Sequence, residues 1–459
     1  MCILFVTFCL QFRLIAKSVK IRTKFIDTGP CGVIHARVLV LDLFTLLHKM
    51  AAKGLQIFRR SNCNGLLRSF SISLRFQSTA PVSSFRYDDL QVTLTSNPQP
   101  KPDSNKLVFG HHFTDHMLEI EWQKDKGWGR PVISPVHDLQ LHPASKVLHY
   151  ATELFEGMKA YRCVDNKVRL FRPMENMRRM QGTAKRTCLP AFDEEEMLKC
   201  LKKLVSIDQE WVPYSDSCSL YIRPTFIGTE PSLGVLMSNR ALLYVLLGPV
   251  GPYFPTGMKP VTLLADPRHV RAWPGGSGQY KMGSNYAPTI AIQKEAIEQG
   301  CQQVLWLYGE DQQLTEVGTM NIMMYWINDE GENELITPPL SGIILPGVTR
   351  KSLLELTREW GEIKVTEKTF TMKTLIKALN ENRVKELFGA GTACVVCPVE
   401  KILHEGKMLE IPTMSEGAPL TNRLYKALLD IQYGRVASPW MEDVDQPSSE
   451  GVEKIARKL

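Results

Sequence analysis

The sequence predicts a mixed α/β protein of two domains, and three observations support this class. The chain has 459 residues, which is too long for a single hydrophobic core. Its composition, 44% hydrophobic and 22% charged, is that of an ordinary globular protein. Short apolar runs typical of buried strands alternate with runs of helical periodicity. A Gly- and Pro-rich segment, 248–252, marks the best domain boundary.

The basic residues are concentrated at the N-terminus. Residues 1–77 contain twelve Lys and Arg against two Asp, which leaves 43 basic and 46 acidic residues in 78–459. The net charge of +7 therefore belongs to this leader. Because the remainder shows no basic face or basic and aromatic motif, we expect no nucleic-acid binding.

Residues 50–77 predict a mitochondrial transit peptide within a disordered leader, and hence a location in the mitochondrial matrix. There is no Asp or Glu from Met50 to Tyr87, whereas Arg and Ser are frequent. A disordered basic tail is the alternative. The apolar run 1–10 is too short to span a bilayer, so we expect no membrane insertion. Translation from Met50, an isoform extension and a secretory signal are alternative readings of residues 1–49.

The remainder divides into further segments. We expect a linker at 78–105, a small α/β domain at 106–250, an interdomain loop at 251–268, a large α/β domain at 269–441 and a polar tail at 442–459. Ser, Pro, Asn and Gln dominate the linker. The folded body is expected to begin near Leu107.

The small domain contains several recognisable elements. Residues 147–161 and 168–171 carry strand-like apolar residues, and 241–247 reads as a buried strand. Asp193 is an N-cap with Glu196 at the third position, and a helical apolar face begins at Met197.

The large domain repeats short strands and helices. We expect a buried strand at 304–308 and a hairpin of 320–327 with 334–337 around the turn 329–331. A helix with Leu353, Leu356 and Trp360 on one face ends at Gly361. Residues 393–396 read as a short buried strand.

Several enzyme classes are disfavoured by absent motifs. The sequence has no dinucleotide or P-loop glycine motif and no serine-hydrolase or zinc-protease motif. The ten histidines lack metal-ligand spacing, and one CxxC cannot form a four-ligand zinc site, so we predict no metal. The scattered cysteines are typical of a reducing compartment.

Four Gly-rich turns remain as candidates for chemistry, at 273–288, 314–321, 345–350 and 388–398. Lys281 lies in the first, in an uncharged stretch, and a desolvated lysine becomes a usable amine nucleophile. A solvated surface lysine is the alternative. The third turn begins a helix, where free N–H groups can bind an anion, although a plain capped turn is the alternative there.

Together with 142–145, 154–160, 219–224 and 230–235, these turns resemble the branched-chain amino acid aminotransferases, and the mitochondrial form in particular. The resemblance extends from about Phe109 to Met441. It implies the two-domain type IV pyridoxal-phosphate aminotransferase fold, a homodimer, and pyridoxal 5'-phosphate as cofactor.

The resemblance also implies roles for the cofactor site. Lys281 matches the catalytic lysine that holds the cofactor covalently and moves a proton. Glu316 matches the acid that keeps the pyridine nitrogen protonated, so that the ring can accept electrons. Arg179 matches the phosphate-binding arginine, although Arg172, Arg178 or Arg186 could replace it. The full cofactor set is Lys281, Arg179, Tyr286, Glu316, Thr319, Val348, Thr349 and Thr392.

The implied substrate site binds leucine, isoleucine and valine as amino donors and 2-oxoglutarate as acceptor, in a ping-pong reaction that yields glutamate. An aliphatic pocket distinguishes one methylene by only about 1–3 kcal/mol, so all three amino acids should be accepted. Leu233 and Val235 are expected to come from the partner subunit. The substrate set is Tyr150, Phe155, Tyr221, Arg223, Thr392, Ala393, Leu233 and Val235. The aromatic residues Tyr150, Phe155 and Tyr221 could instead be core residues.

Cys394 and Cys397 match a CxxC that acts as a thiol redox switch in the mammalian enzymes; a buried pair of small residues is the alternative. Ser284, Ala287 and Thr349 depart from the usual pattern, which puts loop geometry in slight doubt.

Three rival functions are possible: a relative acting on D-amino acids or aminodeoxychorismate, a non-catalytic protein with the same fold, and a CxxC thiol oxidoreductase.

Overall fold

The computed structural model describes residues 84–251 and 259–445. The predicted leader, residues 252–258 of the expected interdomain loop and the tail beyond 445 lie outside these residues. No helix within the described ranges is long and apolar enough to cross a membrane.

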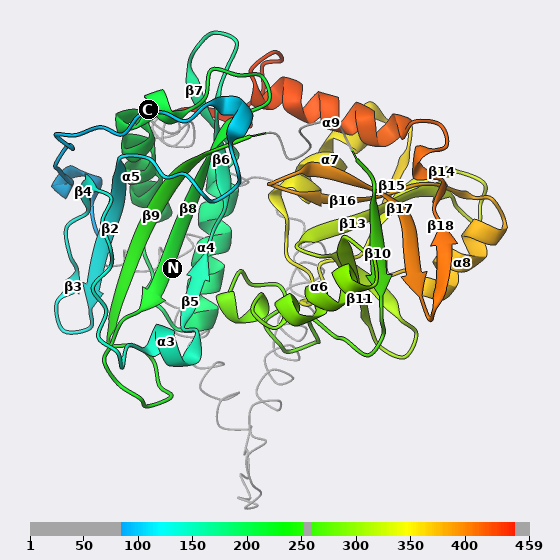
Figure 1. Cartoon of the computed structure of the whole chain (residues 1–459), viewed down its shortest axis with the longest axis horizontal. Coiled ribbons are helices and arrows are strands. Elements are labelled where there is room, and N and C mark those ends of the chain that lie inside the picture. The colour runs from blue at the N-terminus through cyan, green and yellow to red at the C-terminus, as the bar shows by residue number, and fades with distance from the viewer. Residues whose placement is uncertain (1–83, 252–258, 446–459) are drawn as a thin grey trace, which may run out of the picture. The chain divides into compact units, whose positions relative to one another are not determined.

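The first sheet has ten strands, most of them antiparallel, in the order β1-β4-β2-β9-β8-β6-β7-β19, while β3 pairs with β2 and β5 pairs with β8. The long strands β8 and β9 run side by side through its middle (Figure 1). Its strands are β1 (Gln91–Val92), β2 (His116–Gln123), β3 (Gly127–Trp128), β4 (Val132–Pro135), β5 (Glu153–Phe155), β6 (Met158–Arg162), β7 (Val168–Phe171), β8 (Ser219–Gly228), β9 (Arg240–Val250) and β19 (Met441–Asp443).

The second sheet has nine strands in the order β12-β11-β10-β17-β16-β13-β14-β15, with β18 beside β17. It is mixed, because β10 lies parallel to both β11 and β17. Its strands are β10 (Val261–Ala265), β11 (Gln303–Tyr308), β12 (Gln313–Val317), β13 (Met320–Ile327), β14 (Asn333–Thr337), β15 (Lys364–Glu367), β16 (Val384–Gly391), β17 (Val395–His404) and β18 (Lys407–Glu410).

Helices cover the sheets and complete their cores. Helices α4 (Pro173–Thr187) and α5 (Glu194–Ile207) pack on the first sheet. On the second sheet, Met324 of β13 belongs to the core under α8 (Met372–Asn380), while Met323 faces α7 (Val348–Trp360) and α9 (Pro419–Gln432). Successive strand residues point to opposite faces, so β13 contributes to both cores. Two shorter helices are α3 (Lys146–Tyr150) and α6 (Thr289–Glu298).

Several local predictions are confirmed. The Asp193 carboxylate accepts hydrogen bonds from the N–H groups of Glu195 and Glu196 at the start of α5. Helix α7 ends at Gly361, whose φ of 69° is left-handed. The strands β13 and β14 form the predicted hairpin, and the predicted buried strands correspond to β9 and β11.

The predicted segment boundaries need three corrections. Phe85, in the expected linker, is only 3% exposed and packs against Trp128 and Phe192, so the folded body begins well before Leu107. The expected interdomain loop contains β10. The tail expected from 442 begins later, because β19 pairs with β7 and Val444 is buried. Phe85, β10 and β19 are each held by residues distant in the sequence, which local composition does not reveal.

Two expected strands also differ. Residues 146–150 form α3 rather than a strand. The strand expected at 393–396 is found only in part: Ala393 and Cys394 form a turn after β16, whereas Val395 and Val396 begin β17, and Val395 has a left-handed φ of 66°. The apolar side chains are buried as expected, but burial alone does not distinguish a tight turn from a strand.

Candidate active site

A cavity of about 320 Å³ lies between residues of the first sheet and residues of the second. It brings together eleven of the predicted site residues, namely Phe155, Arg179, Tyr221, Arg223, Lys281, Tyr286, Thr319, Val348, Thr349, Thr392 and Ala393. Phe109, Gly157, Asn321, Leu345, Gly347, Ala390 and Gly391 complete the lining. Glu316, Tyr150, Leu233 and Val235 are not among the lining residues.

Two hydrogen bonds, one to its carbonyl oxygen and one from its N–H, hold the backbone of Lys281 at this cavity. Its carbonyl oxygen accepts a hydrogen bond from the Phe155 N–H at 3.1 Å, and its own N–H donates to Thr183 Oγ1 at 3.2 Å. Its Nζ donates to the Tyr286 hydroxyl at 3.2 Å and lies 4.4 Å from the centroid of the Phe155 ring. The loop that carries Lys281 is therefore attached to β5 of the first sheet.

The surroundings of Lys281 make its amine a weak base. Burial lowers the pKa of Lys281 to about 7, and the positive charge of Arg179 contributes to the lowering. Glu156 opposes this effect. At physiological pH a large share of the Lys281 side chains is therefore neutral. The neutral amine is the form that can act as a nucleophile or accept a proton.

Glu316 of β12 is buried next to an arginine. Its Oε1 accepts hydrogen bonds from the Leu345 N–H at 3.1 Å and from Asn321 Nδ2 at 3.3 Å. Burial raises the pKa of Glu316, and the charge of Arg271, with which it forms an ion pair, offsets part of that rise. Its Oε2 lies within ion-pair distance of Arg271, but has no well-aligned hydrogen bond within the described part of the chain.

Arg179 of α4 forms a buried, two-point ion pair with Glu156. Arg179 Nε and Nη2 each lie 2.7 Å from a carboxylate oxygen of Glu156, and the two side chains are 8% and 0% exposed. Burial raises the pKa of Glu156, but the charge and hydrogen bonds of Arg179 outweigh it and the pKa is lowered. Arg179 Nη1 donates to the Pro346 carbonyl oxygen. A guanidinium has five N–H groups, so two are not used by these contacts.

The start of helix α7 lies next to Arg179 in the cavity lining. Gly347 is the N-cap of α7, and Val348 and Thr349 are its first residues. A Cβ on Gly347 would lie 2.1 Å from Asn321 Oδ1, so only glycine allows this close approach. The free N–H groups of the first turn and the Arg179 guanidinium together favour a phosphate-sized anion.

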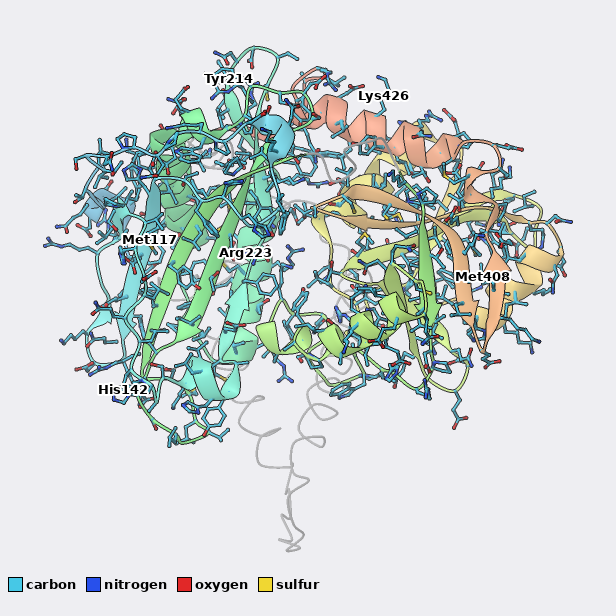
Figure 2. The ribbon with its side chains drawn as sticks, in the orientation of Figure 1. Met117, His142, Tyr214, Arg223, Met408 and Lys426 are labelled. Atoms are coloured by element: carbon cyan, nitrogen blue, oxygen red, sulfur yellow. The ribbon has the colours of Figure 1, made fainter. Side chains whose placement is uncertain are left out.

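Another part of the cavity wall consists of aromatic side chains and the guanidinium of Arg223. Arg223 lies on the side of the first sheet that is turned towards the second (Figure 2). Its Nη2 donates to the Tyr221 hydroxyl at 3.0 Å, and its guanidinium lies 4.8 Å from the Phe155 centroid. Its buried Nε has no partner among the described residues. The ring of Phe109 packs 4.9 Å from that of Tyr221.

A buried lysine supports the turn that carries Thr392 and Ala393. Lys159 Nζ donates to the Ala393 carbonyl oxygen at 3.0 Å. Burial lowers the pKa of Lys159 to about 8. Cys394 and Cys397 follow as buried free thiols, and burial raises the pKa of each to about 12.

The structure does not bring the remaining predicted residues into this cavity. Leu233 and Val235 lie in the loop between β8 and β9 and are 63% and 78% exposed. Tyr150 is also exposed, and its hydroxyl donates to the Leu233 carbonyl oxygen.

Sequence reasoning missed five residues of the site: Phe109, Glu156, Lys159, Arg271 and Asn321. Glu156 and Lys159 lie in the segment 154–160 that carried the resemblance, but nothing in that segment indicates their partners. Arg271 lies ten residues before Lys281, and no sequence pattern links it to Glu316, with which it forms an ion pair. Only the folded chain shows these pairs.

One group of potential metal ligands also exists. Asp266, His269 and Glu295 place a ligand atom each within 4.8 Å of one another. The guanidinium of Arg268 forms ion pairs with both carboxylates. Because a side-chain cation already compensates these charges, we assign no metal to the group.

Comparisons with known proteins show which proteins this chain is similar to. The family model of the class IV aminotransferases matches residues 153–402. The chain is 62% identical over 357 residues to the cytosolic branched-chain-amino-acid aminotransferase of Mus musculus, covering 78% of this chain and 92% of that protein. It is 57% identical over 361 residues to the mitochondrial branched-chain-amino-acid aminotransferase of Bos taurus, and this match also covers 78% of this chain and 92% of that protein.

A solved structure is similar as well. The crystal structure of the T.th. branched-chain amino acid aminotransferase, complexed with N-(5'-phosphopyridoxyl)-L-glutamate, matches with a TM-score of 0.57 and 25% identity. The match covers 71% of this chain and 98% of that chain.

Proposed function

The chain belongs to the class IV aminotransferases, and within them to the branched-chain amino acid aminotransferases; from this membership we propose that it transaminates leucine, isoleucine and valine with 2-oxoglutarate by a ping-pong mechanism. The observation that carries the proposal is the Lys281 amine, which has a pKa of about 7 and contacts Tyr286 in a cavity lined by the matched residues.

Pyridoxal 5'-phosphate fits this cavity. The two N–H groups of Arg179 not used by Glu156 and Pro346, together with the first turn of α7, suit the phosphate group. Glu316 Oε2 forms an ion pair with Arg271 but no well-aligned hydrogen bond with the described residues, so this carboxylate could also accept one from a protonated pyridine nitrogen. When bound, this cofactor supplies an electron sink for the charge left by removal of the α-proton.

The protein's own groups would then carry out binding and proton transfer. Lys281, as a neutral amine, would hold the cofactor and later move a proton from the substrate α-carbon. The Tyr286 hydroxyl, 3.2 Å from Lys281 Nζ, would orient that amine. Thr319, Val348, Thr349 and Thr392 would complete the cofactor site.

The substrate would bind at the aromatic end. The backbone N–H groups of Thr392 and Ala393 would bind its α-carboxylate, and Lys159 would keep that turn in place through the Ala393 carbonyl. Phe155 and Tyr221 offer an apolar wall for an aliphatic side chain. For 2-oxoglutarate, the guanidinium of Arg223, which lines the cavity, is a suitable donor for the distal carboxylate.

We infer that the active form is a homodimer. The exposed apolar side chains of Leu233 and Val235, with Tyr150 beside them, are unusual for a surface that remains in water. In a symmetric dimer the same loop of each subunit would complete the other subunit's pocket.

The mitochondrial matrix is the location we propose, on the acid-free, Arg- and Ser-rich composition of 50–77. Relatives from both compartments match at similar identity, so identity does not decide this point. A fluorescent protein fused behind residues 50–77 should accumulate in mitochondria, whereas a diffuse signal would contradict the proposal.

The decisive experiment is an activity measurement on a chain that begins at Ser78 and so retains Phe85. We expect leucine and 2-oxoglutarate to give glutamate, and the purified protein to be yellow with added cofactor. Activity on D-leucine or aminodeoxychorismate alone would favour a different member of the fold. A colourless protein without activity would favour a non-catalytic role, and thiol–disulfide exchange without transamination would favour an oxidoreductase.

The lowered pKa of Lys281 predicts a pH dependence of cofactor recombination. Below about pH 7 the amine is protonated and cannot react, so the rate at which apoenzyme regains activity with pyridoxal phosphate should rise about tenfold from about pH 6 to about pH 8. It should then level off. A rate that continues to rise towards pH 10 would indicate an ordinary lysine.

The CxxC predicts a redox effect. We expect hydrogen peroxide to lower the activity, dithiothreitol to restore it, and Cys394→Ala to blunt the loss. The raised pKa values leave little thiolate at neutral pH, so the loss should be slow and should accelerate as the pH is raised. Equal loss in the wild type and Cys394→Ala would end this hypothesis.

A further inference from the structure

Lys146 is a fully buried lysine that lies outside the cavity and has no part in the proposed mechanism. It is the first residue of α3 and only 2% exposed. Lysine is rarely buried unless its charge is paired and its three N–H donors are satisfied. The partners of this ammonium therefore indicate what it does.

Within the described part of the chain, the three partners of Lys146 Nζ belong to the connection between β8 and β9. Its Nζ donates to the carbonyl oxygens of Leu236 at 3.0 Å and Met237 at 2.8 Å. It also lies 2.7 Å from Glu230 Oε2. The connection lies beside α3 at the bottom of the view in Figure 1.

Glu230 closes the connection at its base. Its two carboxylate oxygens accept hydrogen bonds from the backbone N–H and the side-chain Nδ2 of Asn239, each at 3.0 Å. The hydrogen bond from Lys146 lowers the pKa of Glu230, so this carboxylate stays ionised at neutral pH. Lys146 and Glu230 therefore form one clamp that holds residues 231–238 as a closed loop.

The clamp determines which way the loop's side chains point. Because the carbonyl oxygens of Leu236 and Met237 turn inward to the ammonium, their side chains turn outward and are exposed. Leu233 and Val235 are exposed on the same loop. The Tyr150 hydroxyl, from the other end of α3, binds the Leu233 carbonyl oxygen.

We propose that Lys146 is a positioning residue for the active site of the partner subunit: it fixes the 231–238 loop so that Leu233 and Val235 enter the substrate pocket of a second copy of this chain. This inference rests on the proposed homodimeric aminotransferase. It adds that substrate affinity at one site depends on a buried lysine of the other subunit, which contacts neither substrate nor cofactor.

The first test replaces Lys146 by methionine, which keeps most of the length of the side chain and removes the charge. We expect the KM for leucine to rise about tenfold, with kcat and the visible spectrum nearly unchanged. A tenfold change is the lower end of the range for the loss of one methylene contact in a hydrophobic pocket. Lys202→Met is the matched control, because Lys202 of α5 is similarly buried and is paired with Glu442 of β19. An unchanged KM in Lys146→Met, or an equal rise in Lys202→Met, would overturn the proposal.

A mixed dimer separates action on the partner from a local effect. One subunit carries Lys146→Met and the other carries Lys281→Ala, with different affinity tags for purification. The single working site then receives its loop from the subunit with an intact Lys146, so the KM for leucine should return to the wild-type value. A KM that stays raised would show a local effect and overturn the proposal. If instead the wild type fails to transaminate leucine, the proposed function itself is wrong.

Discussion

Lys281→Ala should lower the kcat of leucine transamination by about 10²–10⁴-fold, the range for loss of a group that transfers a proton. The amine is the group in the cavity with a pKa near neutrality and a position beside Tyr286. The measurement is glutamate formation from leucine and 2-oxoglutarate at saturating substrate and cofactor, together with the visible absorption of the purified variant.

Lys385→Ala is the control for this variant, because Lys385 is an exposed lysine on β16 of the same sheet. It should leave kcat within about twofold of the wild type, as surface substitutions usually do. A Lys281→Ala enzyme with more than a tenth of the wild-type kcat would show that another residue is the catalytic lysine. Lys159, with its pKa of about 8, would then be the next candidate.

Glu156→Gln should lower the free energy of unfolding of the apoenzyme by about 3–5 kcal/mol, because removing one partner leaves a buried charge uncompensated. The charge is that of Arg179, which is 8% exposed and bound at two points by Glu156. With pyridoxal phosphate bound, the phosphate would again compensate Arg179. We therefore expect a clearly smaller loss in the holoenzyme, measured by urea denaturation of both forms.

Glu355→Gln is the matched control for the ion pair. Glu355 pairs with Arg172 at 2.7 Å but is more exposed, so its loss should cost at most about 1 kcal/mol, equally in the apoenzyme and the holoenzyme. Should Glu156→Gln lose the same stability with and without cofactor, Arg179 would not meet the phosphate. One of the other arginines near α4 would then have that role.

The ion pair with Glu156 balances the charge of Arg179 but leaves part of its guanidinium available for an anion. Glu156 uses one edge of the guanidinium, and two N–H groups are not used by the contacts to Glu156 and Pro346. The carboxylate thus fixes the direction of the guanidinium, and the charge it cancels is supplemented by the N–H groups at the start of α7.

Features that depend on neighbouring residues could be predicted from the sequence. The Asp193 cap, the left-handed end of α7 at Gly361 and the β13–β14 hairpin each depend on a few consecutive residues, and each is found where expected. The family resemblance indicated Lys281 and most of the residues that line the cavity. These predictions needed no knowledge of which strands pair.

Features that depend on distant contacts appeared only in the tertiary structure. Glu156 is 23 residues from Arg179, and Lys146 is 90 residues from Leu236. Phe85 and β19 looked like linker and tail because their partners lie on other strands and helices. Hydrophobic periodicity and turn residues report local conformation, whereas a buried charge is stabilised only by the group that the fold brings to it. The sequence by itself therefore determined the chemistry available to this protein, and tertiary structure decided which charges are compensated and which remain for ligands.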